Sequence, residues 1–546
     1  MYGVEAVACG ARRGHKAGVT APVSFDARFT RALPADPSRE NATRQVRGAA
    51  FSFVSPTPVA EPVMLAWVPE VAALLGLPAE PTPEWTLALA GNRLLPGMVP
   101  YAAAYGGHQF GNWAGQLGDG RAITLGELVA PDGARWDVQL KGPGPTPYSR
   151  RADGRAVLRS SLRELVCSEA MFHLGVPTTR ALALVGTGEP VVRDLLYDGN
   201  PRAEPGAITT RVAPSFLRFG SLELPASRGD VRLLEQLVDY ALATQFPALG
   251  PRSPQAVVAL FEEVVRRTAA LVLQWQAVGF VHGVMNTDNM SLLGVTLDYG
   301  PYGWLEGFDP AWTPNTTDLP GRRYAYGNQP SVAQWNLMCL ANALVPLVGE
   351  TKPLEAALDA FADVAADAQL STMRAKLGLS PLEARAHDDR ALLRDLYRVL
   401  SSTETDWTLF FRALADVTPA LEGAPDAALV QPLERAFYAP AEVVGEVRAG
   451  FAAWLRAYLA RVGAEGLEPT QRRARMNGVN PLYVPRNALA HTVIQAVEQG
   501  DTALLATWLE VLRRPYEEQP GREAWAARRP EWARHQPGCS MLSCSS

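Results

Sequence analysis

The pattern of hydrophobic and polar residues predicts a long helix in the middle of the chain, over residues 254–278. Ser253 and Pro254 stand where an N-cap residue and a first-turn proline are expected, and Gly279 is placed to end the helix. Apolar side chains recur at helical spacing and form one stripe that would pack against a core: Val257, Phe261, Val264, Leu271, Trp275 and Val278.

Shorter periodic segments predict a fold in which strands come first and helices follow. Residues 25–100 are rich in proline and polar turns, and from residue 330 onward helical patterns dominate. Alternating and helical patterns between them predict an α+β fold. The expected elements are a helix near 69–76, strands at 121–128 and 136–141, a helix over 155–174 ended by Gly175 and Pro177, strands at 180–186 and 189–193, and a helix over 487–499.

The loop after the long helix carries the residues most typical of a catalytic site. It contains His282, Asp288 and Asn289, and we expect residues 292–297 to form a tight hairpin that delivers Asp298 in an Asp-x-Gly turn. Two carboxylates and a carboxamide can hold a divalent metal and a hydroxyl nucleophile beside a nucleoside triphosphate. This order of elements is that of the catalytic half of a protein-kinase fold. Asp and Asn are also common in ordinary turns, because their side chains bond nearby backbone.

Lysine is rare in this chain, with four lysines among the 51 Lys and Arg residues. A lysine that persists in an ordered segment is therefore a candidate for a role that the wide guanidinium cannot fill. Lys141 ends the predicted strand 136–141, and Glu164 lies on the next predicted helix, as in the lysine–glutamate pair of kinase folds. The alternative is that Glu164 is a solvated helix residue. Lys352 and Lys376 fall in helical stretches that we expect to be exposed.

Two further segments are candidates for phosphate contacts. Residues 101–127 are dense in glycine, which lets a backbone turn sharply and approach phosphate, although a hairpin without a ligand fits as well. Arg211 and Arg218 are separated by two helical turns in a largely apolar segment, so we expect both to face one way, partly buried against an anion such as phosphate. A salt-bridged surface is the alternative.

Composition and charge narrow the class of protein. The 546 residues suffice for about two to four domains or lobes, and 47% hydrophobic with 20% charged residues is typical of a globular enzyme. The net charge of −5 comes without a long basic stripe, so we expect no nucleic-acid partner. No apolar run reaches the roughly 18 residues that span a bilayer, so we expect no membrane partner either. We expect a monomer.

The cysteines and the arginine bias bear on the compartment. Five scattered cysteines lack metal-ligand spacing, and their odd number argues against a disulfide framework. We therefore expect no structural zinc site and a reducing cytoplasm. The arginine bias indicates a GC-rich gene and hence a bacterium. Arg12, Arg13 and Lys16 near the N-terminus leave mitochondrial import as the alternative.

Several motifs together resemble one family, the selenoprotein O (SelO/YdiU) group of pseudokinase-like proteins. The resemblance covers roughly residues 25–546 and implies a protein-kinase-like bilobal fold that binds ATP in a flipped orientation. It implies transfer of AMP, not of the γ-phosphate, to Ser, Thr or Tyr hydroxyls of proteins. The matching segments are Tyr-Gly-Gly-His-Gln-Phe-Gly, Gln-Leu-Gly-Asp-Gly-Arg, Leu-Lys-Gly-x-Gly-x-Thr-Pro-Tyr-Ser-Arg, Arg-Val-Ala-x-Ser-x-Leu-Arg-Phe-Gly, Asn-Thr-Asp-Asn-Met and Asp-Tyr-Gly-Pro.

The resemblance also assigns roles to individual residues. Asp288 matches the proposed general base, and Asn289 and Asp298 match the ligands of a Mg²⁺ or Mn²⁺ ion. The positions that match nucleotide-binding residues, including the lysine–glutamate pair, are Gly118, Gly120, Arg121, Lys141, Asp153, Gly154, Glu164, Arg211, Arg218 and Asp298.

We expect four parts along the chain. They are a flexible tail at 1–24, an N-lobe at 25–225 with the glycine-rich loop, strands and Lys–Glu pair, a helical C-lobe at 226–420 with the catalytic and metal-binding loops, and a helical extension at 421–546. The last nine residues, including Cys539 and Cys544, are expected to form a flexible tail.

The chain departs from two patterns. In an ordinary protein kinase the metal-binding Asn comes about five residues after the catalytic Asp, whereas Asn289 follows Asp288 directly, which puts γ-phosphoryl transfer in doubt. A conventional phosphotransferase and a nucleotide-binding scaffold remain the alternatives. Some family members also pair a cysteine after the Asp-x-Gly with the C-terminal one, but Pro314 stands at that position here. Cys544 is then expected to pair with Cys539 or to stay unpaired.

Overall fold

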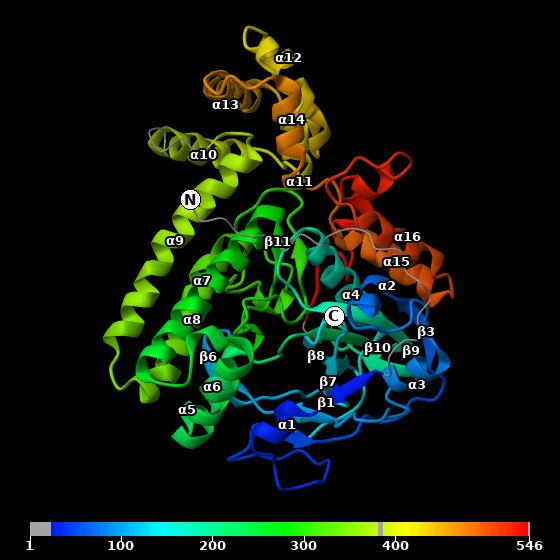
Figure 1. The fold of residues 1–546 in the computed structure, drawn as a ribbon. Coiled ribbons are helices and arrows are strands. Elements are labelled where there is room, and N and C mark those ends of the chain that lie inside the picture. The colour runs from blue at the N-terminus through cyan, green and yellow to red at the C-terminus, as the bar shows by residue number, and fades with distance from the viewer. Residues whose placement is uncertain (1–22, 381–385, 544–546) are drawn as a thin grey trace.

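The computed structural model describes residues 23–380 and 386–543, and its fold is α+β, as predicted (Figure 1). An antiparallel eight-stranded sheet has the order β2-β4-β7-β8-β10-β9-β3, with β1 paired to β7. The pairs β5–β6 and β11–β12 lie outside it. The strands are β1 Ser24–Asp26, β2 Phe51–Phe53, β3 Val63–Trp67, β4 Tyr101–Ala103, β5 Gly106–Gln109, β6 Asn112–Gln116, β7 Ala122–Val129, β8 Arg135–Lys141, β9 Arg180–Arg193, β10 Arg202–Ala213, β11 Phe280–Val281 and β12 Gly303–Trp304.

The predicted strands at 121–128 and 136–141 are confirmed as β7 and β8, which pair so that Lys141 lies opposite Ala122. The two strands predicted at 180–186 and 189–193 are in fact one, β9. A register shift in its pairing with β10 accommodates the glycine-containing break that looked like a turn in the sequence. Ser24, which was placed in the tail, pairs with Val129 in β1. Residues 1–22 lie outside the described residues.

Different helices cover the two faces of the sheet. One face packs on α2 (Pro69–Leu74) and α3 (Pro83–Leu89), through a core that includes Trp85. The other packs on α4 (Leu158–His173), whose far side meets α15 (Asn487–Glu498) and α16 (Ala503–Leu512). Figure 1 shows these two late helices beside α4. The predicted helices 69–76, 155–174 and 487–499 are thus confirmed, within a few residues at their ends.

The predicted central helix is confirmed as α7, Pro254–Val278, and lies in the core of a helical part. The Ser253 hydroxyl accepts from the Ala256 amide, and Gly279 ends the helix with a φ of 80°. The remaining helices are α1 Arg28–Ala32, α5 Phe219–Ser227, α6 Val231–Gln245, α8 Gln329–Val348, α9 Lys352–Lys376, α10 Ala386–Leu400, α11 Trp407–Leu414, α12 Asp426–Val430, α13 Gly445–Gly463 and α14 Pro469–Asn477.

The helical segment Tyr326–Val348 is long and apolar enough to cross a membrane by length and composition. Gln, Asn and Ser interrupt its apolar run, so no membrane span is predicted there from the sequence. Half of its most apolar stretch is buried inside the protein, where Leu337 and Leu344 belong to the same core as α7. This burial is what a core helix requires.

The C-terminal residues differ from the expected loose tail. Residues 538–543 lie against the segment that follows the Asp-x-Gly turn. The Leu542 amide donates to the Pro314 carbonyl at 3.0 Å, and the Thr316 amide donates to the Leu542 carbonyl at 2.7 Å. Cys539 is buried in this segment. The two alternatives for Cys544, pairing with Cys539 or no pairing, concern a residue outside the described range.

Two other expectations are wrong. Residues 292–297 do not form a ladder of paired strands: a single antiparallel bridge joins Met290 to Thr296, and Thr296 forms a second bridge to Thr178. The side chains of Leu292 and Leu297 are buried in the core instead. Lys376, expected to be exposed, is 3% exposed, because the end of α9 is covered by the C-terminal helices.

Candidate active site

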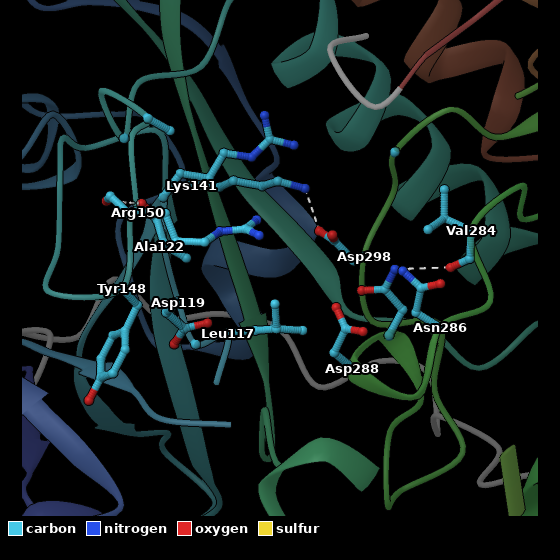
Figure 2. A pocket seen from close by; sticks show the side chains of 18 of the residues that line it. Leu117, Asp119, Ala122, Lys141, Tyr148, Arg150, Val284, Asn286, Asp288 and Asp298 are labelled. Carbon is cyan, nitrogen blue, oxygen red and sulfur yellow. Dashed lines mark hydrogen bonds and ion pairs between the residues drawn. The ribbon is translucent and has the colours of Figure 1, made fainter. Parts of the chain in front are cut away.

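A cavity of about 680 Å³ is lined from the sheet side by residues 117–122, Lys141 and residues 148–155, and from the helical side by the loop 284–289 and Asp298. Figure 2 shows Lys141 reaching toward Asp298, with Asp288 on the same side as Asp298. Two of the predicted site residues, Glu164 and Arg218, do not line it. Those that do are Gly118, Gly120, Arg121, Lys141, Asp153, Gly154, Arg211, Asp288, Asn289 and Asp298.

Lys141 is held by a buried ion pair with Glu164. It is the last residue of β8, and Glu164 lies on α4, which packs on the same sheet. Lys141 Nζ is 2.6 Å from Glu164 Oε2, and the glutamate side chain is 2% exposed. Lys141 Nζ also contacts Asp298 Oδ1. The predicted pair is therefore present, and the alternative of a solvated Glu164 is wrong.

Arg211 reaches the same carboxylates from the neighbouring strand β10. Its Nη1 donates to Glu164 Oε1 at 2.9 Å and to Asp298 Oδ1 at 2.8 Å. Its Nε and Nη2 both donate to Gln139 Oε1, at 2.9 and 2.7 Å. Two cations and two carboxylates thus compensate each other in a buried position, where an unpaired charge would be costly.

Arg218 does not share a face with Arg211, and the helical spacing expected for the two is wrong. Arg211 lies on strand β10, whereas Arg218 precedes helix α5 as its N-cap residue. Arg218 Nη1 donates to the backbone carbonyl of Asp288 at 2.8 Å, and its guanidinium lies 4.5 Å from the centre of the Tyr105 ring. Arg218 therefore holds the backbone of the Asp288 loop and does not line the cavity.

Asp288 lies in the 3-10 turn Thr287–Asn289 and projects into the cavity (Figure 2). Its Oδ2 accepts from Gln109 Nε2 at 3.3 Å, and its Oδ1 is buried with no hydrogen-bond partner. Burial raises the pKa of the Asp288 carboxyl to about 6, against the opposing field of Arg218. A carboxylate with a free oxygen and a pKa near neutrality has the properties of a general base.

Two glycines allow close approaches at the site. Gly107 of β5 lies against Asp288, and a Cβ at position 107 would be 2.7 Å from Asp288 Oδ1. Gly118 has a φ of +96°, and a Cβ there would be 2.5 Å from the Tyr148 ring. Side chains at either position would displace a wall of the cavity.

The outer part of the cavity is formed by the glycine-rich turn and the segment 148–155. Arg121 directly precedes β7, and Asp153 and Gly154 belong to the segment 148–155. Asp153 is half exposed and pairs with Arg193, with 2.7 Å between Oδ1 and Nη2. These residues line the cavity as predicted.

Asn289 and Asp298 present the oxygen ligands that Mg²⁺ and Mn²⁺ prefer. Asn289 Nδ2 donates to the Val284 carbonyl at 2.9 Å, which leaves the amide oxygen for another partner. Burial would raise the pKa of Asp298, but Lys141 and Arg211 outweigh it and hold that pKa well below its usual range. An ionised carboxylate and a free amide oxygen on one wall fit a divalent cation.

Sequence analysis missed two residues that hold the site together. Gln139 fixes the guanidinium of Arg211, and it lies two positions before Lys141 on one strand, so strand periodicity places both on one face and could have found it. Gln109 stands in the matching segment Tyr-Gly-Gly-His-Gln-Phe-Gly, but nothing in that segment indicates that it donates to Asp288. It reaches Asp288 because β5 crosses the catalytic loop, a contact between segments far apart in the sequence.

With this geometry established, comparison with known proteins decides the family. Residues 38–513 match the family model described as "Protein adenylyltransferase SelO". The chain belongs to the SelO family. This membership makes it an enzyme of the nucleotidyltransferase class, with ATP as the substrate that such a transfer implies.

Full-length relatives agree with the SelO match. The chain is 58% identical over 527 residues to a protein of Azoarcus sp. (strain BH72), covering 96% of this chain and 100% of the relative. It is 55% identical to a protein of Rhodopirellula baltica, with coverage of 97% and 100%. It is 54% identical to one of Nitrosospira multiformis, with coverage of 97% and 98%. All three relatives are named "Protein nucleotidyltransferase YdiU".

Proposed function

We propose that this SelO-family enzyme transfers AMP from ATP to hydroxyl side chains of proteins (Ser, Thr or Tyr) and releases pyrophosphate. The observation that carries the proposal is the pair of cations, Lys141 and Arg211, that converge on Glu164 and Asp298 at the buried end of the cavity. The β- and γ-phosphates are the most highly charged end of a triphosphate, and they would bind to these fixed cations at the buried end of the cavity. The α-phosphate is then nearest to the nucleophile, as the resemblance to selenoprotein O implies.

The order of the elements supports a protein-kinase-like arrangement of the two parts. A strand lysine, a glutamate on the following helix, a catalytic loop and an Asp-x-Gly turn come in the kinase order. The lysine, the loop and the Asp-x-Gly turn line one cavity, and the glutamate pairs with the lysine. Departing pyrophosphate would be stabilised by Lys141 and Arg211, with Arg121 directly before β7. The predicted nucleotide contact of Arg218 stays a prediction, since its side chain lies behind the Asp288 loop.

Asn289 and Asp298 would hold Mg²⁺ or Mn²⁺. Such an ion neutralises charge on the phosphates when it is bound. Asp298 is suited to share its charge among the ion, Lys141 and Arg211, because its low pKa keeps it ionised. The same two residues would orient the α-phosphate toward Asp288.

Asp288 would accept the proton of the attacking hydroxyl. A bond forms between the acceptor oxygen and the α-phosphorus, the bond from the α-phosphorus to the bridging oxygen breaks, and pyrophosphate leaves with the electron pair. Asp288 lines the cavity, and Gln109 and Arg218 hold it there through its Oδ2 and its backbone carbonyl.

The experiment is to incubate the full chain and a protein extract with ATP labelled on either the α- or the γ-phosphate. We expect the α-label to stay on protein and intact mass to rise by about 329 Da, the mass of the AMP adduct, not by the roughly 80 Da of phosphate. Retention of the γ-label would instead establish a conventional phosphotransferase. Binding of ATP without transfer of either label would establish a scaffold.

A further inference from the structure

A second cluster of chemically reactive side chains lies beside the catalytic loop. Among the residues that the structure describes, His108, Glu223 and Cys339 form a group with metal-ligand chemistry. One ring nitrogen of His108, one carboxylate oxygen of Glu223 and Cys339 Sγ all lie within 4.8 Å of one another. The three residues come from β5, α5 and α8, so their spacing in the sequence carries no metal motif.

The cluster has an unsatisfied buried atom. Glu223 is 4% exposed; its Oε1 lies 2.7 Å from His108 Nδ1, and its Oε2 is buried with no hydrogen-bond partner. Leaving a buried carboxylate oxygen without a partner costs on the order of 1–3 kcal/mol. A cation beside Glu223 would remove that cost. Cys339, also buried, is a free thiol on the side of α8 that packs on α5.

The donor set selects the metal. One imidazole nitrogen, one carboxylate oxygen and one thiolate suit Zn²⁺, whereas Mg²⁺ and Mn²⁺ prefer oxygen alone. Tetrahedral bonds of about 2.0–2.3 Å put ligand atoms roughly 3.3–3.8 Å apart, so the present separations need small side-chain movements. Zn²⁺, one carboxylate and one thiolate sum to zero charge, which suits the buried side chains of Glu223 and Cys339.

We propose that His108, Glu223 and Cys339 bind one Zn²⁺ ion that fastens β5 to α5 and α8, with water in the fourth position. The Cys339 thiol loses its proton to solvent as the ion binds, because thiolate is the ligand form. The site is joined to the catalytic loop. The His108 amide donates to Thr287 Oγ1 at 2.7 Å, and the neighbouring Gln109 donates to Asp288. An ion there would fix the strand that positions Asp288.

The test uses the full chain, stripped of metal with a chelator and then titrated with Co²⁺, which substitutes for Zn²⁺. We expect one equivalent to produce the near-ultraviolet absorption of a thiolate–cobalt bond, and Zn²⁺ to displace it. Cys339→Ser should lose the absorption, and Glu223→Gln should weaken binding at least about tenfold, since even outer partners of a metal site contribute that much. Cys539→Ser, at another buried free thiol outside the cluster, should keep it.

Two results would overturn this proposal. They are no thiolate absorption in the wild-type chain, and absorption that persists in folded Cys339→Ser. The first result would reduce the cluster to a hydrogen-bonded His108–Glu223 pair. Circular dichroism establishes that each variant is folded, and Glu223→Gln, which keeps the size of the side chain, decides if Cys339→Ser does not fold.

Discussion

Glu164 Oε2 lies 2.6 Å from Lys141 Nζ, with the glutamate almost completely buried. The other oxygen of the same carboxylate accepts from Arg211 at 2.9 Å. One helix residue therefore fixes the position of two cations that come from neighbouring strands. The catalytic arrangement of the sheet side depends on this carboxylate although it does not line the cavity.

Replacing Glu164 with Gln should remove the charge and leave Lys141 and Arg211 with Asp298 as their shared anion. We expect nucleotidyl transfer to fall on the order of 10²–10³-fold, as for other groups that hold transition-state charge. The free energy of unfolding should fall by about 3 kcal/mol, as when a buried pair loses one partner. Labelled transfer and denaturant unfolding measure the two effects.

The matched control for Glu164→Gln is Glu235→Gln. Glu235 pairs with Arg252 at 3.0 Å, but both side chains are substantially exposed. Such surface pairs contribute about 0–1 kcal/mol, so this variant should keep its stability and its transfer rate. Equal effects of the two substitutions would contradict the role given to Glu164.

Replacing Asp298 with Ala should abolish transfer at any Mg²⁺ or Mn²⁺ concentration, because the proposed ion loses its carboxylate ligand and the two cations lose a partner. Asp298→Asn, which keeps an oxygen but no charge, should retain a trace of activity that rises with metal concentration. Incorporation of α-label as a function of Mn²⁺ measures both. Wild-type rates in Asp298→Ala would refute the assignment.

The rate of transfer should depend on the protonation of Asp288. A base acts in its ionised form, and its raised pKa of about 6 means that kcat/KM should rise with pH up to about 6 and level off above it. Asp288→Asn should lower the rate on the order of 10²–10⁴-fold and remove this rise. The pH profile of the residual activity of Asp288→Asn tests this assignment. The same rise near pH 6 in that variant would assign the titration to another group.

Lys376 should make the stability depend on pH. Burial lowers its pKa to about 7, and its Nζ lies 2.8 Å from Asn480 Oδ1. Above pH 7 the folded chain holds this lysine neutral, whereas the unfolded chain keeps it protonated up to about pH 10. Because the unfolded state then binds more protons, this residue should make the free energy of unfolding increase between about pH 7 and 10.

The comparison for Lys376 is with Lys376→Met, which has a similar shape and no charge. Denaturant unfolding is measured at several pH values between about 6 and 10, a range that includes the two pKa values. The free energy of unfolding should rise more steeply with pH for the wild type than for the variant. Parallel curves would mean that Lys376 titrates as an ordinary exposed lysine.

Local patterns predicted the individual elements well. The capping residues Ser253 and Gly279 bound α7 as expected, because helix ends are set by side chains and backbone angles close in sequence. Lys141 and Glu164 were found as a pair because their strand and helix follow each other along the chain. The break in β9 and the absent hairpin at 292–297 were misjudged, because pairing with other strands and burial override local signals there.

The sequence by itself determined the α+β order of elements, the family motifs and the loop that carries Asp288, Asn289 and Asp298, since all of these are encoded over short stretches. Only the tertiary structure decided what those residues touch. In the tertiary structure Arg218 donates to the backbone of the Asp288 loop, Lys376 is buried, and His108 lies beside Glu223 and Cys339. The physical reason is that burial and charge pairing depend on contacts between segments distant along the chain, which no local pattern records.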